Sequence, residues 1–286
     1  NPPDLTGSQR AWDLAAIEQA KVKLSASAKD QRHMARLLAS TSSHSGDWLK
    51  ALPISACGLR LSNDEIRIAV CLRLGCDICL PHTCKCGALV DSTGRHGLAC
   101  RLSAGRQARH YALNDIVHHT LTKAGIPAVK EPTGLVAGLR PDGATLVPWS
   151  SGRCMAWDAT VADTLADTYL DRTAQQSGSA AQVLAEAKIG KYASLGNNFV
   201  FIPVAFETLG SICEETSSFL YDLGKRMTLV SGDPREPSFL FQRLSVAVQR
   251  GNALCVLATS FSSTMEFLTV SYKCAYALKN LRRGIM

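Results

Sequence analysis

The crowding of cysteines in the first third of the chain is the feature that most restricts its fold. Six of the eleven cysteines fall within a stretch of thirty residues: Cys71, Cys76, Cys79, Cys84, Cys86 and Cys100. A secreted disulfide framework would spread its pairs through a small chain that carries a signal peptide. The first thirty residues are instead polar and broken by charges, so no secretory signal is visible. The cluster therefore indicates a metal site in a reducing compartment.

A closed zinc site is predicted within this stretch. Zinc in structural sites takes four soft or borderline ligands in a tetrahedron, and the sequence supplies Cys84, Cys86, His96 and Cys100. Nearby glycines permit the tight turns of a zinc knuckle. Cys84 and Cys86 stand closer than the usual spacing of zinc ligands, so Cys79 or His82 could replace one member. Because a closed site has no open position for substrate, this zinc is expected to be structural or to support DNA binding.

Length, charge and hydropathy set broad limits. The 286 residues allow one large domain or two modest ones, and 46% hydrophobic residues can build a core. No apolar run approaches the roughly 20 residues of a membrane span. The net charge of +7 favours an acidic partner such as nucleic acid. The chain begins at Asn1 without a methionine, which predicts an excised part of a longer polypeptide.

Hydrophobic periodicity predicts an α/β domain after the cysteine cluster. Residues 1–50 read as helical with a serine-rich break at 40–46, and Ser62 to Glu65 caps another helix that Gly75 can end. The later elements are a helix at 101–124, strands at 128–131, 144–147 and 154–161, a helix at 173–195, a strand at 198–206, and helices at 215–229 and 236–258. A strand that follows a helix requires a crossover, so the sheet is expected to be mixed. Pro203 predicts an edge or end position for the last strand.

Two aspartates are candidates for a divalent metal site. Asp142 stands at a strand start, and Asp158 interrupts the apolar strand that follows. A hairpin can place these carboxylates side by side, and a cation between them offsets their repulsion. Mg²⁺ or Mn²⁺ held in this way suits phosphodiester hydrolysis. The alternative for Asp142 is that it only forms a turn with Gly143.

Polar residues on two predicted helices are candidates for the same site. Lys188, Lys191 and Tyr192 are spaced to share one helical face, and a lysine near a metal-bound water can stabilise developing charge. The alternative is a solvated basic stripe. On the long helix, His110 and Asn114 lie four residues apart behind Arg109 and could contact phosphate or the metal shell. Their alternative is the polar face of an amphipathic helix.

These residues together resemble a known family. The relevant runs are Gly105-Arg106, Arg109-His110, Asn114, Glu131-Pro132, Arg140-Pro141-Asp142-Gly143, Trp157-Asp158 and Lys188-Ile189-Gly190-Lys191-Tyr192. They look like the restriction-like endonuclease region of non-LTR retrotransposons, and Ala51-Leu52-Pro53 resembles the linker motif before the zinc knuckle of those polyproteins. The resemblance spans roughly residues 48–252, with the order of motifs preserved. It implies a PD-(D/E)xK core of order α-β-β-β-α-β, a zinc knuckle, and DNA nicking for target-primed reverse transcription.

The resemblance also implies roles for single residues. Asp142 and Asp158 would bind the catalytic metal, which Glu131 could also reach. Lys188 would act on the attacking water or the transition state, with Lys191 and Tyr192 contacting phosphate or ordering the site. Arg106, Arg109, His110, Asn114 and Arg140 would bind nucleic acid. The sequence departs from the plain pattern at Thr160, where a lysine is usual, so the lysine must come from the next helix, and Glu186 is kept as an alternative acid.

The predicted organisation is a helical linker region at 1–75, a zinc knuckle at 76–103, a nuclease domain at 104–260 and a C-terminal tail at 261–286 of unknown structure. The expected partners are target DNA and retrotransposon RNA, with a reverse transcriptase upstream in the same polyprotein, no membrane, and a nuclear location. The first alternative is an inactive zinc-containing module that only binds nucleic acid. The second is a zinc-stabilised scaffold, which would show no DNA affinity that weakens with salt.

Overall fold

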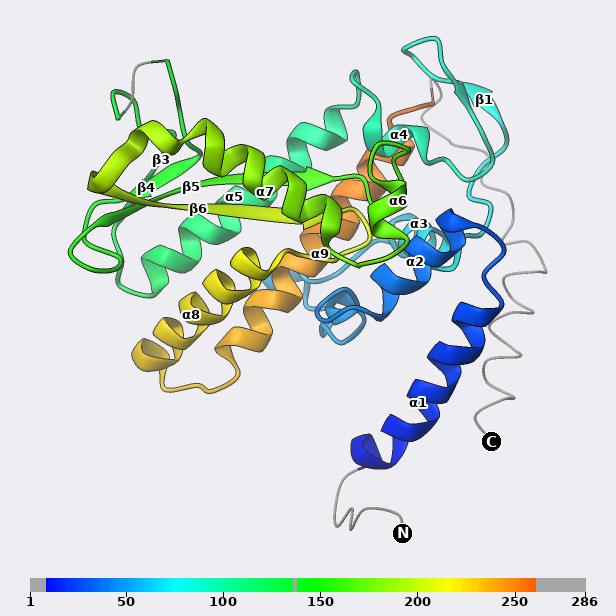
Figure 1. Cartoon of the computed structure of the whole chain (residues 1–286), viewed down its shortest axis with the longest axis horizontal. Coiled ribbons are helices and arrows are strands. Elements are labelled where there is room, and N and C mark those ends of the chain that lie inside the picture. The colour runs from blue at the N-terminus through cyan, green and yellow to red at the C-terminus, as the bar shows by residue number, and fades with distance from the viewer. Residues whose placement is uncertain (1–8, 136–137, 261–286) are drawn as a thin grey trace.

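The computed structural model describes residues 9–135 and 138–260 (Figure 1). A mixed sheet lies at one end of the molecule, and helices surround it. The cysteine-rich segment and the N-terminal helices lie at the other end (Figure 1). The predicted C-terminal tail lies outside the described residues.

Helices make up the N-terminal region, as the sequence predicts. They are α1 (Gln9–Ala26), α2 (Gln31–Thr41), the 3₁₀ turns η1 (Asp47–Leu49) and η2 (Ser55–Cys57), and α3 (Asn63–Leu74). Ser62 starts α3 with a capping box: its Oγ accepts from Glu65 N at 3.3 Å, and its N–H donates to Glu65 Oε2 at 2.7 Å. Gly75 ends α3 with φ +72°, a left-handed conformation that suits glycine. Both predicted boundaries of this helix are therefore confirmed.

The cysteine-rich segment forms a small unit of its own. It contains the two-stranded antiparallel pair β1 (His82–Thr83) and β2 (Leu89–Val90), followed by the short helix α4 (His96–Ala99). Its buried side chains Ile78, Val90 and Leu98 join one apolar cluster with residues of α2, α3 and the last described helix. The unit is thus packed on the body of the protein rather than tethered loosely to it.

The main sheet has four strands in the order β3-β4-β5-β6. The strands are β3 (Ala128–Lys130), β4 (Gly143–Thr145), β5 (Cys154–Ala162) and β6 (Phe199–Glu207). The first two pairings are antiparallel, and β5 pairs with β6 in parallel. The α/β class and the mixed sheet are therefore confirmed. Pro203 lies in the edge strand β6, as expected of a residue that cannot donate to a ladder.

Helices before, within and after the strands complete the domain. They are α5 (Ala104–Lys123), α6 (Leu170–Thr173), α7 (Ser179–Lys191), the 3₁₀ segment η3 (Ala193–Asn198), α8 (Glu214–Ser231) and α9 (Glu236–Leu257). The single helix predicted at 173–195 is wrong. Gly178 adopts φ +83° between α6 and α7, so the chain turns there and α7 begins only at Ser179.

Alternation along β5 separates the two faces of the sheet. Met155, Trp157 and Ala159 belong to the large core with α5, α8 and α9. Ala156 instead packs with Tyr192, which follows α7. Since side chains alternate along a strand, Asp158 shares the α7 face with Ala156. The sheet thus lies between α7 on one side and α5, α8 and α9 on the other (Figure 1).

Candidate functional site

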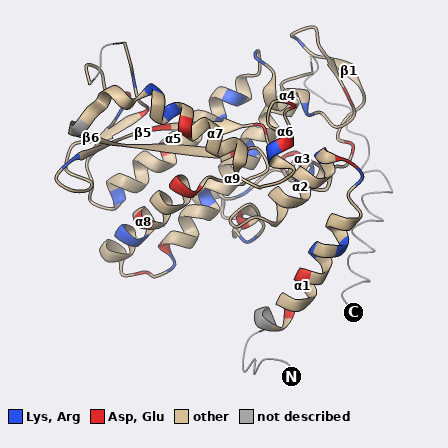
Figure 2. Cartoon of the chain, in the orientation of Figure 1, with Lys and Arg blue, Asp and Glu red and all other residues tan. Residues whose placement is uncertain are grey.

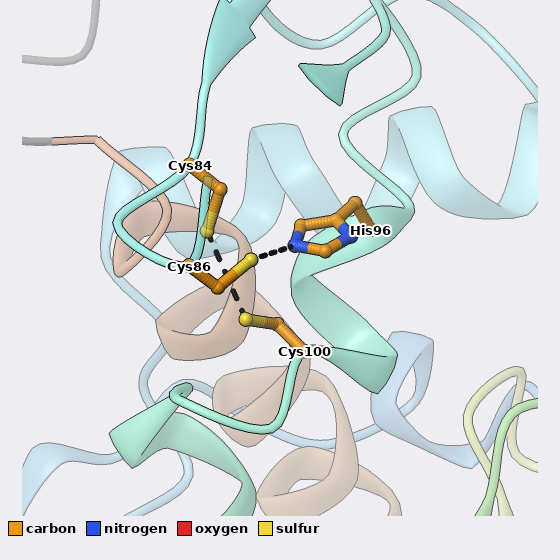
Figure 3. Close-up of side chains that lie close together, drawn as sticks. All are labelled: Cys84, Cys86, His96 and Cys100. Carbon is orange, nitrogen blue, oxygen red and sulfur yellow. Dashed lines mark hydrogen bonds between the residues drawn. The ribbon is translucent and has the colours of Figure 1, made fainter. Parts of the chain in front are cut away.

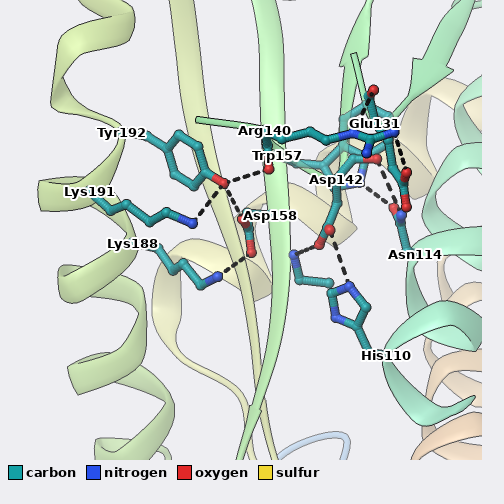
Figure 4. Close-up of polar contacts among 11 residues, drawn as sticks. His110, Asn114, Glu131, Arg140, Asp142, Trp157, Asp158, Lys188, Lys191 and Tyr192 are labelled. Atoms are coloured by element: carbon teal, nitrogen blue, oxygen red, sulfur yellow. Dashed lines mark hydrogen bonds and ion pairs between the residues drawn. The ribbon is translucent and has the colours of Figure 1, made fainter. Parts of the chain in front are cut away.

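Asp142, directly before β4, lies beside Asp158 of the neighbouring strand β5 (Figure 4). Gly143 pairs with Trp157 across the antiparallel ladder of β4 and β5, which sets the preceding Asp142 beside Asp158. Both side chains are largely buried, at 15% and 5% exposure. Asp142 directly precedes β4 and does not form the turn with Gly143 that was the alternative, since Gly143 is itself a strand residue.

Asp142 is held by the backbone of β5 and by a histidine of α5. Its Oδ2 accepts from the N–H of Ala159 at 2.6 Å, and its Oδ1 lies 3.1 Å from His110 Nε2. This hydrogen bond to Asp142 raises the pKa of His110, against the opposing effect of burial. His110 is therefore better able to carry a positive charge beside this carboxylate.

Asp158 is held from the other side of the sheet by α7. Lys188 Nζ donates to its Oδ1 at 2.5 Å, and the Tyr192 hydroxyl is 2.6 Å from its Oδ2 (Figure 4). Burial and this hydrogen bond both raise the pKa of Tyr192, so the hydroxyl stays protonated and donates. The carbonyl of Arg140, at 2.9 Å, competes for the same proton.

The four carboxylate oxygens of Asp142 and Asp158 are not saturated with hydrogen-bond partners. Each has one protein partner, whereas an ionised carboxylate oxygen can accept two. The negative charges of both aspartates also raise the pKa values of His110 and Tyr192, although by less than the hydrogen bonds and the burial described above. The two carboxylates thus act on the same neighbouring groups, and carboxylate oxygens are the ligand type that Mg²⁺ and Mn²⁺ prefer in general.

Asn114 has a positioning role that the sequence did not reveal. Its Nδ2 donates to the backbone oxygen of Asp142 at 3.2 Å, and its Oδ1 accepts from Trp157 Nε1 at 2.8 Å. Only 4% of Asn114 is exposed, so the expected direct contact with nucleic acid is not available to it. It ties the start of β4 to β5 and α5 instead.

Glu131 is not brought to the aspartates. Its Oε2 pairs with Arg140 Nη2 at 2.6 Å, and Arg140 Nε also donates to its carbonyl at 3.2 Å. In the described part of the chain, the cysteine cluster is the only group of three or more Cys, His, Asp or Glu side chains placed to share an ion, so neither Glu131 nor the two aspartates belong to one. The expected reach of Glu131 into the metal shell is therefore absent from this arrangement, while Arg140 remains exposed.

The remaining polar residues of α7 divide between two places. Lys191 Nζ lies 4.8 Å from the centre of the Tyr192 ring and donates to its hydroxyl at 3.2 Å. The Tyr192 ring also stacks on Phe201. Glu186 accepts from Gln182 at 3.3 Å and lines a different cavity, which also includes Glu215. That position gives Glu186 no place beside Asp158.

The two arginines of α5 also differ. Arg109 is 3% exposed, and its Nη1 donates to Asn252 on α9 at 2.5 Å. Arg109 is therefore enclosed between two helices rather than exposed at the surface, and its contact with nucleic acid stays a prediction. Arg106 is exposed, and its Nη1 makes a long hydrogen bond of 3.4 Å to the carbonyl of Ala99.

The cysteine cluster brings four ligand atoms together (Figure 3). The atoms of Cys84, Cys86, His96 and Cys100 all lie within 4.8 Å of one another, with Cys86 Sγ 3.1 Å from His96 Nε2. A backbone hydrogen bond from Ala88 is the main cause that lowers the pKa of Cys86 to about 7, which favours the thiolate that metals bind. This cluster could bind a metal such as zinc.

The close spacing of Cys84 and Cys86 is explained by a tight turn. Cys84 N donates to Ala88 O at 2.9 Å, and Gly87 has φ +86°, so the turn presents both thiols inward. The two alternative ligands lie elsewhere. Cys79 Sγ faces the carbonyl of Asp91 at 3.6 Å, and His82 Nε2 is 2.9 Å from Thr259 Oγ1. The fold therefore brings together the four residues that the sequence predicted as zinc ligands.

The sequence matches no protein-family model and no curated protein. Among the described helices, none is long and apolar enough to cross a membrane. The function is therefore argued from the geometry of the two sites.

Proposed function

We propose that this protein is a metal-dependent DNA endonuclease whose active site is built on Asp142 and Asp158. The observation that carries the proposal is the place of Asp142, directly before β4, beside Asp158 of the neighbouring strand β5, with Lys188 donating to Asp158 at 2.5 Å. Two enclosed carboxylates beside one lysine form an arrangement suited to phosphodiester hydrolysis.

The proposed reaction is attack of a water oxygen on phosphorus, with rupture of one P–O bond and transfer of a proton to the departing oxygen. A Mg²⁺ or Mn²⁺ ion on Asp142 and Asp158 would supply a polarised phosphate and a more acidic water. Lys188 would stabilise the negative charge that builds up on the phosphate oxygens. Tyr192 and Asn114 would keep the two strands in register around the ion.

The zinc cluster would have a structural role in this proposal. Four ligands close a tetrahedral site, so the cluster would leave no position for substrate. Its place directly before α5 would instead fix the start of the helix that carries His110 and Asn114.

The wider assignment rests on the family resemblance. A PD-(D/E)xK nuclease of a non-LTR retrotransposon would nick target DNA for target-primed reverse transcription in the nucleus. A reverse transcriptase would lie upstream in the same polyprotein, and the element's RNA would be a further partner. The observed order of α5, three strands, α7 and β6 is compatible with such a core.

The decisive experiment is incubation of the zinc-loaded protein with supercoiled plasmid, with and without Mg²⁺ or Mn²⁺. We expect nicked plasmid only with the divalent ion, and no product from Asp142→Asn or Asp158→Asn. Asp222→Asn on α8 is the matched control, because it removes the same charge from an exposed ion pair on the opposite side of the sheet. A parent protein that binds DNA but never cuts it would establish the alternative of an inactive binding module.

A further inference from the structure

A polar cavity opens at the N-terminus of α5, beside the candidate active site. Its volume is about 470 Å³, and its lining includes Arg101, Ser103, Arg106, His110, Thr160 and Lys188. One wall is the last part of β5, just after Asp158. His110 and Lys188, which contact the two aspartates, lie on its border with the active site.

The charge of this cavity is of one sign. Arginines and a lysine line it, and no aspartate or glutamate does. Within the described residues, Arg101 has no hydrogen-bond or ion-pair partner, and Arg106 has no ion pair. Lysines and arginines elsewhere are spread over several helices and loops (Figure 2). Lys188 is paired with Asp158, so the positive charge that the described residues leave unneutralised comes from Arg101 and Arg106.

The start of α5 adds unsatisfied hydrogen-bond donors. The first N–H groups of a helix lack intrahelical partners and carry a partial positive charge. Ser103 occupies the N-cap position of this 20-residue helix, yet its side chain makes no capping hydrogen bond. Ser103 is only 9% exposed, and its Oγ has no partner at all. Arg109, on the same cavity, also has a buried Nε without a partner.

An unpaired buried donor costs free energy unless a ligand satisfies it. A tetrahedral oxyanion would satisfy Ser103 Oγ, the first N–H groups of α5 and the nearby guanidinium groups together. We propose that this cavity binds a backbone phosphate of the DNA strand that enters the candidate active site. The choice of DNA rests on the proposed function, whereas the preference for a phosphate group rests on the cavity alone.

The cavity is continuous with the region of the two aspartates, so the phosphate that it binds would neighbour the phosphate to be cleaved. His110 and Lys188 belong to both places, so a strand that crosses Asp158 would continue along β5 into the cavity. Cys100, a member of the zinc cluster, accepts the N–H of Ser103 through its carbonyl at 3.1 Å. The cluster thus helps to hold the cavity in shape.

The test is binding of a short fluorescein-labelled DNA duplex, measured by anisotropy over a range of KCl concentrations without Mg²⁺ or Mn²⁺. We expect Arg101→Gln/Arg106→Gln to weaken binding about tenfold and to lower the salt slope by about two. Ser103→Asp should weaken binding to a similar extent, because it places a carboxylate where the phosphate would lie. Aspartate is a good N-cap, so this variant should fold at least as stably as the parent.

Arg153→Gln is the matched control. Arg153 is exposed and lies roughly 23 Å from Thr160 along β5, by the usual rise per strand residue. Equal losses in Arg153→Gln and the double variant would overturn the proposal, as would parental binding by Ser103→Asp. Plasmid cleavage is scored separately. If the parent never cleaves plasmid but the variants bind DNA as weakly as expected, the phosphate site stands and the nuclease proposal fails. If the parent cleaves plasmid and the variants bind DNA like the parent, the nuclease proposal stands and the phosphate site fails.

Discussion

Lys188 and Lys191 are separated by one helical turn but have different surroundings. Lys188 donates to the buried carboxylate of Asp158, whereas Lys191 is exposed and lies over the Tyr192 ring. We expect Lys188→Ala to reduce plasmid cleavage by about 100-fold and to leave DNA binding nearly unchanged, because it would act mainly in the transition state. Lys191→Ala should weaken binding and lower the salt slope by about one. The opposite pattern would exchange the two roles, and normal cleavage by both variants would exclude this helix from catalysis.

Glu207 is a buried acid with an incomplete set of partners. Its Oε1 accepts from Ala180 N at 3.0 Å and Ala181 N at 3.4 Å at the start of α7, while its Oε2 has no partner. Burial is the main cause that raises the pKa of Glu207 above its ordinary value of 4.5. The folded state therefore holds this proton more tightly than the unfolded chain does.

The raised pKa of Glu207 predicts a pH dependence of stability. The contribution is fully present below the unfolded pKa and is lost as the pH rises through the folded pKa. Glu207→Gln should therefore flatten the fall in the free energy of unfolding above about pH 4.5, as measured by urea denaturation at several pH values. Glu186→Gln, on the exposed face of α7, is the control and should keep the parental slope. Identical slopes in all three proteins would show that Glu207 is not the group responsible.

The cysteine-rich segment is an element whose small size limits its own core. It contains two strands of two residues and one helix of four, so a bound ion would stabilise its fold strongly. We expect one zinc per chain by metal analysis, and a loss of that zinc in Cys84→Ser and Cys100→Ser. Both variants should also have a lower melting temperature, because the segment packs on α9 through a shared core.

Cys57→Ser is the matched control for the zinc site. Cys57 is an exposed free cysteine outside the cluster, so this variant should keep its zinc and the parental melting temperature. A parent purified without chelator that contains no zinc would contradict the metal assignment. Loss of zinc from Cys79→Ser would instead return Cys79 to the ligand set.

At the scale of the whole molecule, α9 joins the sheet domain to the cysteine-rich unit. Its residues contribute to the core of α5, β5 and α8 and also to the core around α3 and the cysteines. Close approach of α5 and α9 depends on Gly105, where a Cβ would meet the backbone of Cys255 closer than atoms normally approach. The two helices could accommodate a larger residue only by moving apart.

We therefore expect Gly105→Ala to lower the free energy of unfolding by about 1 to 3 kcal/mol, the usual cost of overpacking. Gly190→Ala on α7 is the control, because a Cβ at Gly190 would meet nothing within 4 Å. That variant should be up to about 1 kcal/mol more stable than the parent, since alanine suits a helix better. Urea denaturation of both variants measures the difference, and equal stability of the two would contradict the close-packing argument.

Local patterns in the sequence were sufficient for a large part of this protein. Ser62 and Gly75 bounded a helix through contacts with residues three or four positions away, and Pro203 required an edge strand. The four metal-ligand candidates were recognisable because Cys84 and Cys86 share one turn and His96 and Cys100 share one short helix with its cap. In each case the deciding interactions lie within a few residues of the chain, where spacing and residue type are informative.

Tertiary structure decided the features that depend on distant segments. Arg109 is buried because Asn252, 143 residues later, packs over it. Glu131 is paired with Arg140 across an intervening loop and not with the two aspartates of the candidate active site. The missing side-chain cap of α5 has the same origin, because Ser103 is buried by packing between elements and its Oγ has no partner. Burial and the choice of a partner follow from packing between elements, which residue spacing does not encode.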